Sequence, residues 1–173
     1  MKKHLLGLLL LVMIGPVSAA VNVGVVNVHE LLQRMPEAAK VLSSMEKEFS
    51  GRKNALQGLE TQLKTKSEAL QKDKDVLNDS ELKKRQKEVI DIQRKWQDMG
   101  NELREDVTRR QQEETQRLLK QINAALIKVA KNKKYDLIIH RDAAPYVADS
   151  VEVTEQVMQV LAQDTKKATS GAK

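Results

Sequence analysis

Cysteine is absent from the 173-residue sequence, which excludes disulfides, thiol nucleophiles and cysteine-based metal sites. Aromatic residues make up only 2% of the chain, and they are Phe49, Trp96, Tyr135 and Tyr146. Little large apolar volume is therefore available for an ordinary globular core. Stability must come from helix packing and association, and this composition favours an elongated or oligomeric protein.

The first 19 residues are predicted to be a secretory signal peptide. A basic start at residues 2–4 precedes an apolar run at residues 5–14. That run is too short to cross a bilayer of about 30 Å as a helix, so a retained anchor is the weaker interpretation. Small residues precede the expected cleavage after Ala19, and cleavage after Ala20 is the alternative.

The chain is basic, with a net charge of +6 that falls to +4 when Lys2 and Lys3 leave with the signal. A pI of about 9.4 is found in many nucleic-acid-binding proteins. Export and the scarcity of aromatic stacking residues argue against a nucleic-acid partner. His29 and His140 lack neighbouring ligands at metal-site spacing, and no catalytic triad or phosphate loop is present. We therefore predict no enzyme activity, no metal and no cofactor.

The dominant pattern is an apolar stripe with a strict seven-residue spacing. Its members are Leu42, Phe49, Leu56, Leu63, Leu70 and Leu77, then Leu82, Val89, Trp96 and Leu103. Such a repeat is typical of a helix with a narrow apolar seam, and two such helices form an antiparallel coiled-coil hairpin. The second apolar position passes from Met45 to Arg52, Leu59 and Lys66, so the seam thins towards the tip.

The hairpin helices are predicted over residues 37–77 and 81–132. The turn is placed at residues 78–80, with Ser80 as the N-cap of the return helix. Folding about this turn pairs residues whose numbers sum to about 159, including Leu63 with Trp96. The next pair in this register is Phe49 with Arg110, so an apolar residue lies opposite a charged one.

That mismatch divides the chain. The arm is expected over residues 37–107, and the body over residues 20–36 and 108–163. Body strands are predicted near residues 21–28, 135–140 and 143–147, and Thr154 is expected to cap a final helix. Residues 164–173 are expected to be a disordered tail. A body this small cannot cover its own sheet edges, so other copies should complete it.

Apolar side chains of the body fall on two predicted helical faces. The first, near the end of the return helix, is broad, and the second belongs to the final helix. Their members are Leu118, Leu119, Ile122, Ala125, Leu126 and Val129 on the first, and Val157, Met158 and Leu161 on the second. Tyr135 and Tyr146 are interpreted as body-packing residues.

Several stretches together resemble the Skp/OmpH-like family of periplasmic chaperones. The matching stretches are residues 23–28 with 31–33, residues 36–39, residues 46–49 with Arg52, residues 135–139, Ala144 with Tyr146, and residues 153–157. The resemblance implies an α+β, mostly helical fold in which a coiled-coil hairpin projects from a small β-barrel body completed by trimerisation. It also implies a homotrimer that holds unfolded outer-membrane proteins between its arms without ATP. Delivery to the outer-membrane assembly machinery is implied as well.

Candidate binding residues lie at two places on the arm. The arm tip carries eight basic residues against five acidic ones, a net charge of +3, which suits acidic clients or an anionic membrane surface. The basic residues are Lys64, Lys66, Lys72, Lys74, Lys83, Lys84, Arg85 and Lys87. The resemblance further implies lipopolysaccharide contact by Arg109 and Arg110.

Gly58 and Gly100 are nearly opposite each other in the predicted register. Either they form a hinge that widens the cavity, or small residues let the two helices approach there. The main rival to a chaperone is a structural or tethering coiled-coil protein of the cell envelope. A tether predicts one folded partner, whereas a chaperone predicts broad selectivity for unfolded chains.

Overall fold

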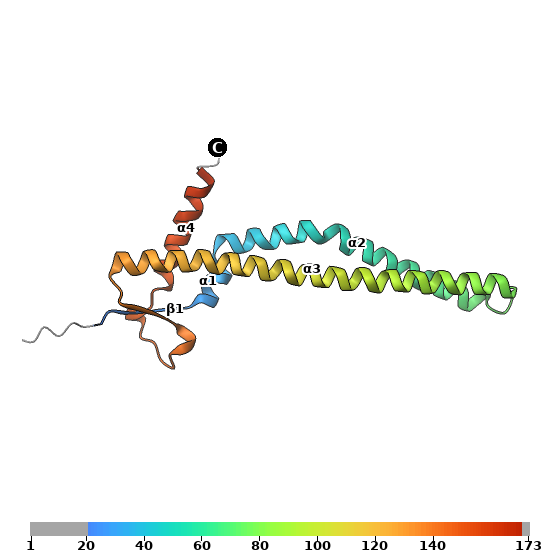
Figure 1. The fold of residues 1–173 in the computed structure, drawn as a ribbon, viewed down its shortest axis with the longest axis horizontal. Coiled ribbons are helices and arrows are strands. Elements are labelled where there is room, and N and C mark those ends of the chain that lie inside the picture. Colours follow the sequence, from blue (N-terminus) through green and yellow to red (C-terminus); the bar gives the residue numbers. More distant parts are fainter. Residues whose placement is uncertain (1–20, 171–173) are drawn as a thin grey trace, which may run out of the picture.

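A computed structural model describes residues 21–170 of the chain. The predicted signal peptide and its cleavage positions, Ala19 and Ala20, lie outside the described residues. The described part consists of a long helical hairpin and a small body at one end of it (Figure 1).

The hairpin consists of α2, Pro36–Asp73, and α3, Asp79–Lys133. Pro36 occupies the first turn of α2, where its missing N–H breaks no helical hydrogen bond. The left-handed backbone of Lys134, with φ 55°, ends α3, and its N–H bonds the carbonyl of Ala130. Neither helix contains an internal proline, and the predicted antiparallel hairpin is confirmed.

The tip of the hairpin differs from the prediction. α2 ends at Asp73, and the backbone N–H groups of Val76 and Leu77 in the following turn both bond its carbonyl. The connection is therefore residues 74–78, not 78–80, and Ser80 is already helical. Asn78 is the N-cap instead, since its side-chain oxygen accepts the N–H of Glu81 at 2.9 Å.

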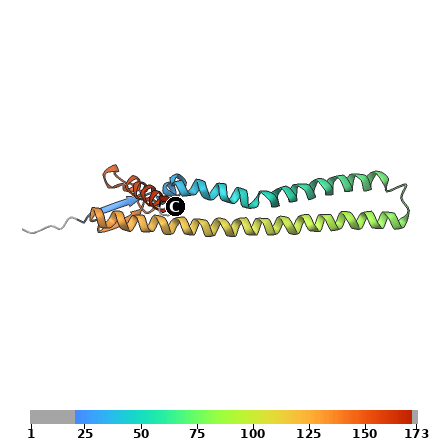
Figure 2. The same ribbon diagram turned by 90° about the horizontal axis from the view of Figure 1, so that it is seen from above.

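The apolar seam is tight only near the middle of the arm. Phe49 and Leu103 of the stripe are buried, as is Leu59 at the second apolar position, while most other members of the stripe, including Trp96, are half-buried. Figure 2 shows why: α2 bends towards the straighter α3 near its middle and stands away from it on either side. Leu42 is 70% exposed, so its predicted place in the seam is wrong.

Among the described residues, the sheet contains two parallel strands. β1, Val23–Val26, pairs with β2, Leu137–His140, in the register Val23 to Leu137. An isolated bridge joins Val25 to Glu152 on the other side of β1. The strand predicted at residues 143–147 is absent, since Arg141–Ala143 forms the 3-10 helix η1 and irregular chain follows. Pro145 has no N–H to donate to a ladder.

The body core forms where α3 meets α1, Val28–Arg34, and α4, Thr154–Ser170. The predicted apolar faces are confirmed for most members. The buried core residues from these faces are Leu118, Ile122, Ala125, Val129, Val157 and Leu161. Leu119 is 39% exposed, so its predicted burial is wrong.

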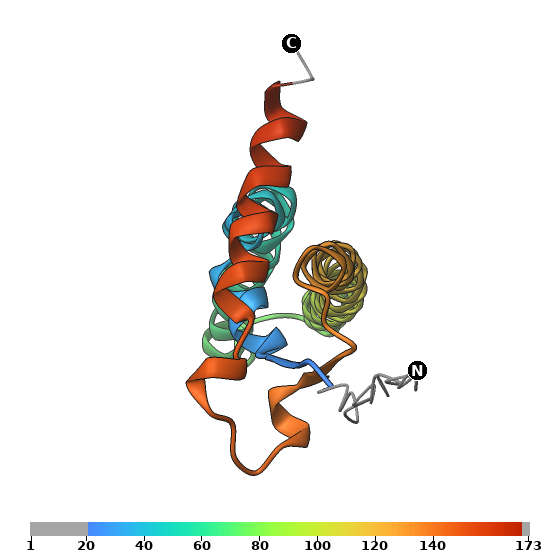
Figure 3. The ribbon, with the colours of Figure 1, turned by 90° about the vertical axis from the view of Figure 1, so that its left-hand side faces the viewer.

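The predictions for the two tyrosines and for the C-terminal residues are confirmed only in part. Tyr135 packs against the core as predicted, but Tyr146 is 83% exposed, so its packing role is wrong within the chain. The Thr154 hydroxyl accepts the N–H of Asn27 at 2.9 Å, which links the start of α4 to the end of β1. The predicted disordered tail is wrong over residues 164–170, because α4 continues to Ser170 and projects sideways from the hairpin (Figure 3). The last three residues of that prediction, 171–173, lie outside the described residues.

Candidate functional site

The predicted basic residues gather at the arm tip, on the end of α2, the turn and the start of α3. Two of them cross the hairpin: Lys66 lies 3.2 Å from Glu88, and Arg85 lies 2.6 Å from Asp73. These exposed pairs help to hold the two helices together where the seam is thin, although each contributes little by itself.

The other six basic residues remain available to a partner. All six are exposed, and none has an ion pair within residues 21–170. They are Lys64, Lys72, Lys74, Lys83, Lys84 and Lys87. Val76 projects from the turn among them with 84% of its surface exposed. The tip thus combines unpaired positive charge with an apolar side chain.

A second candidate surface lies at the root of the arm. A cleft of about 550 Å³ opens between α1, α2 and α3 where α2 stands away from α3. Among the apolar side chains that line it are Leu32, Val41, Leu42, Met45, Phe49 and Leu118. The exposed Leu42 thus lines a cleft instead of a seam.

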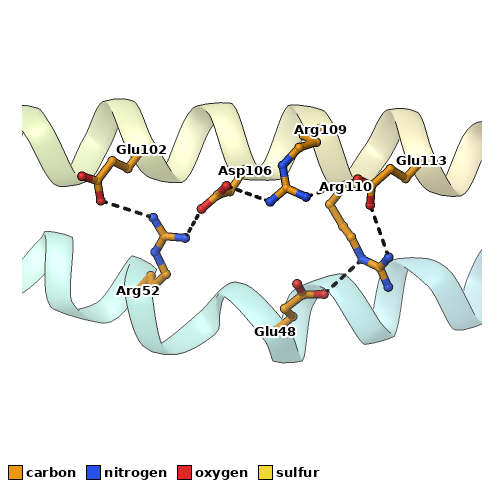
Figure 4. A network of polar contacts seen from close by, with 7 residues as sticks. All are labelled: Glu48, Arg52, Glu102, Asp106, Arg109, Arg110 and Glu113. Carbon is orange, nitrogen blue, oxygen red and sulfur yellow. Dashed lines mark hydrogen bonds and ion pairs between the residues drawn. The ribbon is translucent and has the colours of Figure 1, made fainter.

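Arg109 and Arg110, the predicted lipopolysaccharide contacts, are part of an ion-pair network on α2 and α3 (Figure 4). Arg109 lies 2.9 Å from Asp106 and 3.2 Å from Glu113. Arg110 lies 3.3 Å from Glu48 across the hairpin. An external anion would therefore compete with internal carboxylates for either arginine.

Sequence reasoning missed the centre of this network. Arg52 of α2 lies 2.6 Å from Asp106 of α3 and 4.0 Å from Glu102. The signal was present, because Arg52 and Asp106 fall almost at the register used to pair Phe49 with Arg110. A charged residue at a seam position, matched by the opposite charge in that register, predicts a cross-helix pair.

A buried acid completes the arm root. Glu114 is almost buried, and its two carboxylate oxygens lie 2.9 Å from Arg110 and 2.7 Å from Arg117. A buried carboxylate needs such partners because desolvation otherwise opposes its charge. Glu114 also borders the apolar cleft, so the ion-pair network and the cleft adjoin.

The two predicted glycines do not face each other. Gly100 faces Leu56, and a methyl group added there would make an ordinary contact at 3.8 Å. A methyl group at Gly58 would meet no atom within 4 Å. Close helix approach therefore does not require a glycine at either position, and the hinge stays a prediction.

The described residues offer little to other classes of chemistry. Within residues 21–170, no three or more His, Asp or Glu side chains are grouped as metal ligands. No helix in that range combines the length and hydropathy needed to span a bilayer.

The pairing of Asp106 makes the arm sensitive to acid. Hydrogen bonds from Arg52 and then Arg109 hold the pKa of the Asp106 carboxyl below its usual 3.8, and Asp106 and Glu113 raise the pKa of Arg109. Between the folded and unfolded pKa of Asp106, the unfolded chain binds more protons. The stabilisation that the ionised Asp106 carboxylate contributes is therefore complete above pH 3.8. It is lost as the pH falls through the lower pKa that Asp106 has in the folded protein.

We expect Asp106→Asn to lower the free energy of unfolding at neutral pH and to make progressively less difference as the pH falls below 3.8. Urea unfolding of both proteins, measured from neutral to acid pH, checks this. Asp98→Asn is the matched control, since Asp98 is exposed on the same helix and has no ion pair among the described residues. A difference between wild type and Asp106→Asn that persists unchanged in acid would contradict the assignment.

Comparisons with known proteins identify the family of this chain. A family profile described as "Outer membrane protein (OmpH-like)" matches residues 22–161. Relatives named Chaperone protein Skp include one from Pectobacterium atrosepticum, 34% identical over 83% of this chain and 87% of the relative. Another, from Salmonella typhimurium, is 31% identical over 92% of this chain and 98% of the relative. An OmpH-like structure from Caulobacter crescentus aligns over 85% of this chain and 86% of that chain, with TM-score 0.72 and 18% identity, and shares the fold. The chain therefore belongs to the OmpH-like outer membrane protein family.

Proposed function

We propose that this protein is an ATP-independent periplasmic chaperone that holds unfolded outer-membrane proteins between its arms. The observation that carries the proposal is a long two-helix arm with an exposed basic tip and scattered apolar side chains. Relatives bearing the chaperone name cover most of the chain and support the same function. Assistance in delivery to the outer-membrane assembly machinery is part of this proposal.

The proposed holding surface needs more than one arm, and we propose a homotrimer. β2 has a neighbour only on its β1 side within the described residues. Leu137 on that strand is 52% exposed, and Tyr146 nearby in sequence is more exposed still. Exposed strand edges and apolar side chains are stabilised when other copies cover them. Three copies would combine their strands into the barrel that the family resemblance implies.

Weak and distributed contacts suit a protein that must release its client without nucleotide hydrolysis. Exposed Leu42, Val76 and Ile90 are spread along the arm, so each client pose can bury only modest apolar area. At about 25 cal/mol per Å², many small contacts give useful affinity while each remains easy to break. The arm therefore can hold extended chains of varied sequence.

The unpaired lysines at the tip add long-range attraction to acidic clients or to an anionic membrane surface. Their charges are exposed, so salt must weaken this attraction. Lipopolysaccharide binding at Arg109 and Arg110 stays a prediction, and there the anion would compete with Asp106 and Glu48. The tip lysines involve no such competition.

The direct test dilutes a urea-unfolded outer-membrane barrel into buffer with the purified mature protein. We expect suppressed light scattering and a complex whose mass, measured by light scattering after gel filtration, corresponds to three copies and one client. A soluble protein of similar size is the control. Continued aggregation with excess protein present would refute the chaperone assignment, and binding of one folded envelope protein alone would favour the tether.

Charge at the tip should set the association rate. Replacing Lys72, Lys74 and Lys83 by Gln should slow client capture at low salt by about tenfold and flatten its salt dependence. Stopped-flow fluorescence of a labelled client measures this. Glutamine at Lys95, Lys120 and Lys131, which are exposed away from the tip, is the matched control. Equal effects of both triple variants would remove the special role of the tip.

The hinge prediction has its own test. Alanine at Gly58 and Gly100 fits without a clash and should stabilise the arm by about 1 kcal/mol per site. A hinge further predicts slower amide exchange around residue 58 and a lower capacity for large clients. Gly51→Ala is the control, because a methyl group there also meets open space. A double variant that is stabilised but retains wild-type exchange and capacity would rule out the hinge.

A further inference from the structure

The end of α4 is a part of the chain that the family match does not include. The match ends at residue 161, whereas α4 continues to Ser170, leaving nine helical residues beyond it. The start of α4 belongs to the body core through Val157 and Leu161. The following residues, 162–170, need a separate explanation, because they project past that core (Figures 1 and 3).

Two side chains of this segment tie it to both helices of the hairpin. The Lys128 ammonium of α3 donates to both oxygens of Asp164, at 2.8 and 2.6 Å. The Thr165 hydroxyl contacts the carboxylate of Glu37, in the first turn of α2, as well as the carbonyl of Leu161 in its own helix. One helical turn of α4 therefore contacts α3 and the root of α2 together.

The space beneath this turn contains polar atoms that lack partners. A cavity of about 230 Å³ is lined by Glu37, Gln121, Asp164 and Thr165 together with Ala124 and Leu161. One oxygen of Glu37 and the side-chain oxygen of Gln121 are buried without a hydrogen bond. Burying such acceptors opposes closure, so the contacts of Asp164 and Thr165 act against a desolvation cost.

We propose that residues 162–170 form a C-terminal brace that links the root of α2 to α3 and thereby sets the angle of the arm. The brace is reversible. When it opens, water can hydrogen-bond to Glu37 and Gln121, and this hydration offsets part of the free energy of the lost contacts. A small rotation at the root moves the distant tip by many ångströms, since α2 is 38 residues long. The consequence for the client cavity rests on the proposed function, whereas the brace itself does not.

The absence of cysteine makes a distance measurement straightforward. Spin labels would be attached through Ser43→Cys on α2 and Asn123→Cys on α3, both exposed positions. The labelled protein is diluted with unlabelled protein so that only distances within one chain are counted. Deletion of residues 164–173, or the double substitution Asp164→Ala and Thr165→Val, should widen the distance distribution about twofold.

Amide exchange provides the second readout. In both variants, amides of residues 40–45 should exchange about tenfold faster, while those around Leu103 in the middle of the arm remain unchanged. The matched control deletes residues 171–173 alone and should leave both readouts at their wild-type values. Circular dichroism shows whether each variant retains its helices.

Two results would overturn the proposal. One is a wild-type distance distribution in the double-substituted protein, because its contacts are removed while the helix keeps its length. The other is equal widening in the control deletion, which would place the effect outside the brace. Both results concern the protein without a client, so they are independent of the chaperone test.

Discussion

The narrow contact between two long helices is the constraint on which the rest of the structure depends. Only Phe49, Leu59 and Leu103 are buried along the arm, so burial of apolar surface gives limited cohesion there. Cross-helix ion pairs such as Arg52 with Asp106 supplement it. The surface left over is largely polar and basic, and an apolar cleft opens at the root of the arm.

α3 connects the arm to the body because the same 55-residue helix serves both. Its first part carries the arm seam, while Leu118, Ile122, Ala125 and Val129 form the centre of the body core. α2 has no such anchor and depends on α1, on the cleft walls and on the contact between Thr165 and Glu37. Variation in the arm angle is therefore expected at the root of α2, where the proposed brace lies.

The sequence predicted where the candidate binding residues lie along the arm, but it did not predict which side chains they contact. The repeat placed the lysines near the tip, and the mismatch of Phe49 with Arg110 marked the region of the ion-pair network. The partners of Arg109 and Arg110 could not be read from composition, since Asp106, Glu113 and Glu48 compete for them in three dimensions. The cleft was missed as well, because it arises from a bend in α2 that involves no proline.

The sequence by itself determined the two helices, their antiparallel pairing, the strands at β1 and β2 and the final helix, because each has a local periodic signal. Only the tertiary structure decided the tip, where Asn78 caps α3 in preference to Ser80 and the turn moves to residues 74–78. It likewise decided that residues 143–147 form no strand and that residues 164–170 are helical. At the tip the choice is between neighbouring capping residues, and the backbone path of the turn makes it. The strand needs a neighbour and the end of α4 needs a docking surface, and both are supplied by residues distant in sequence.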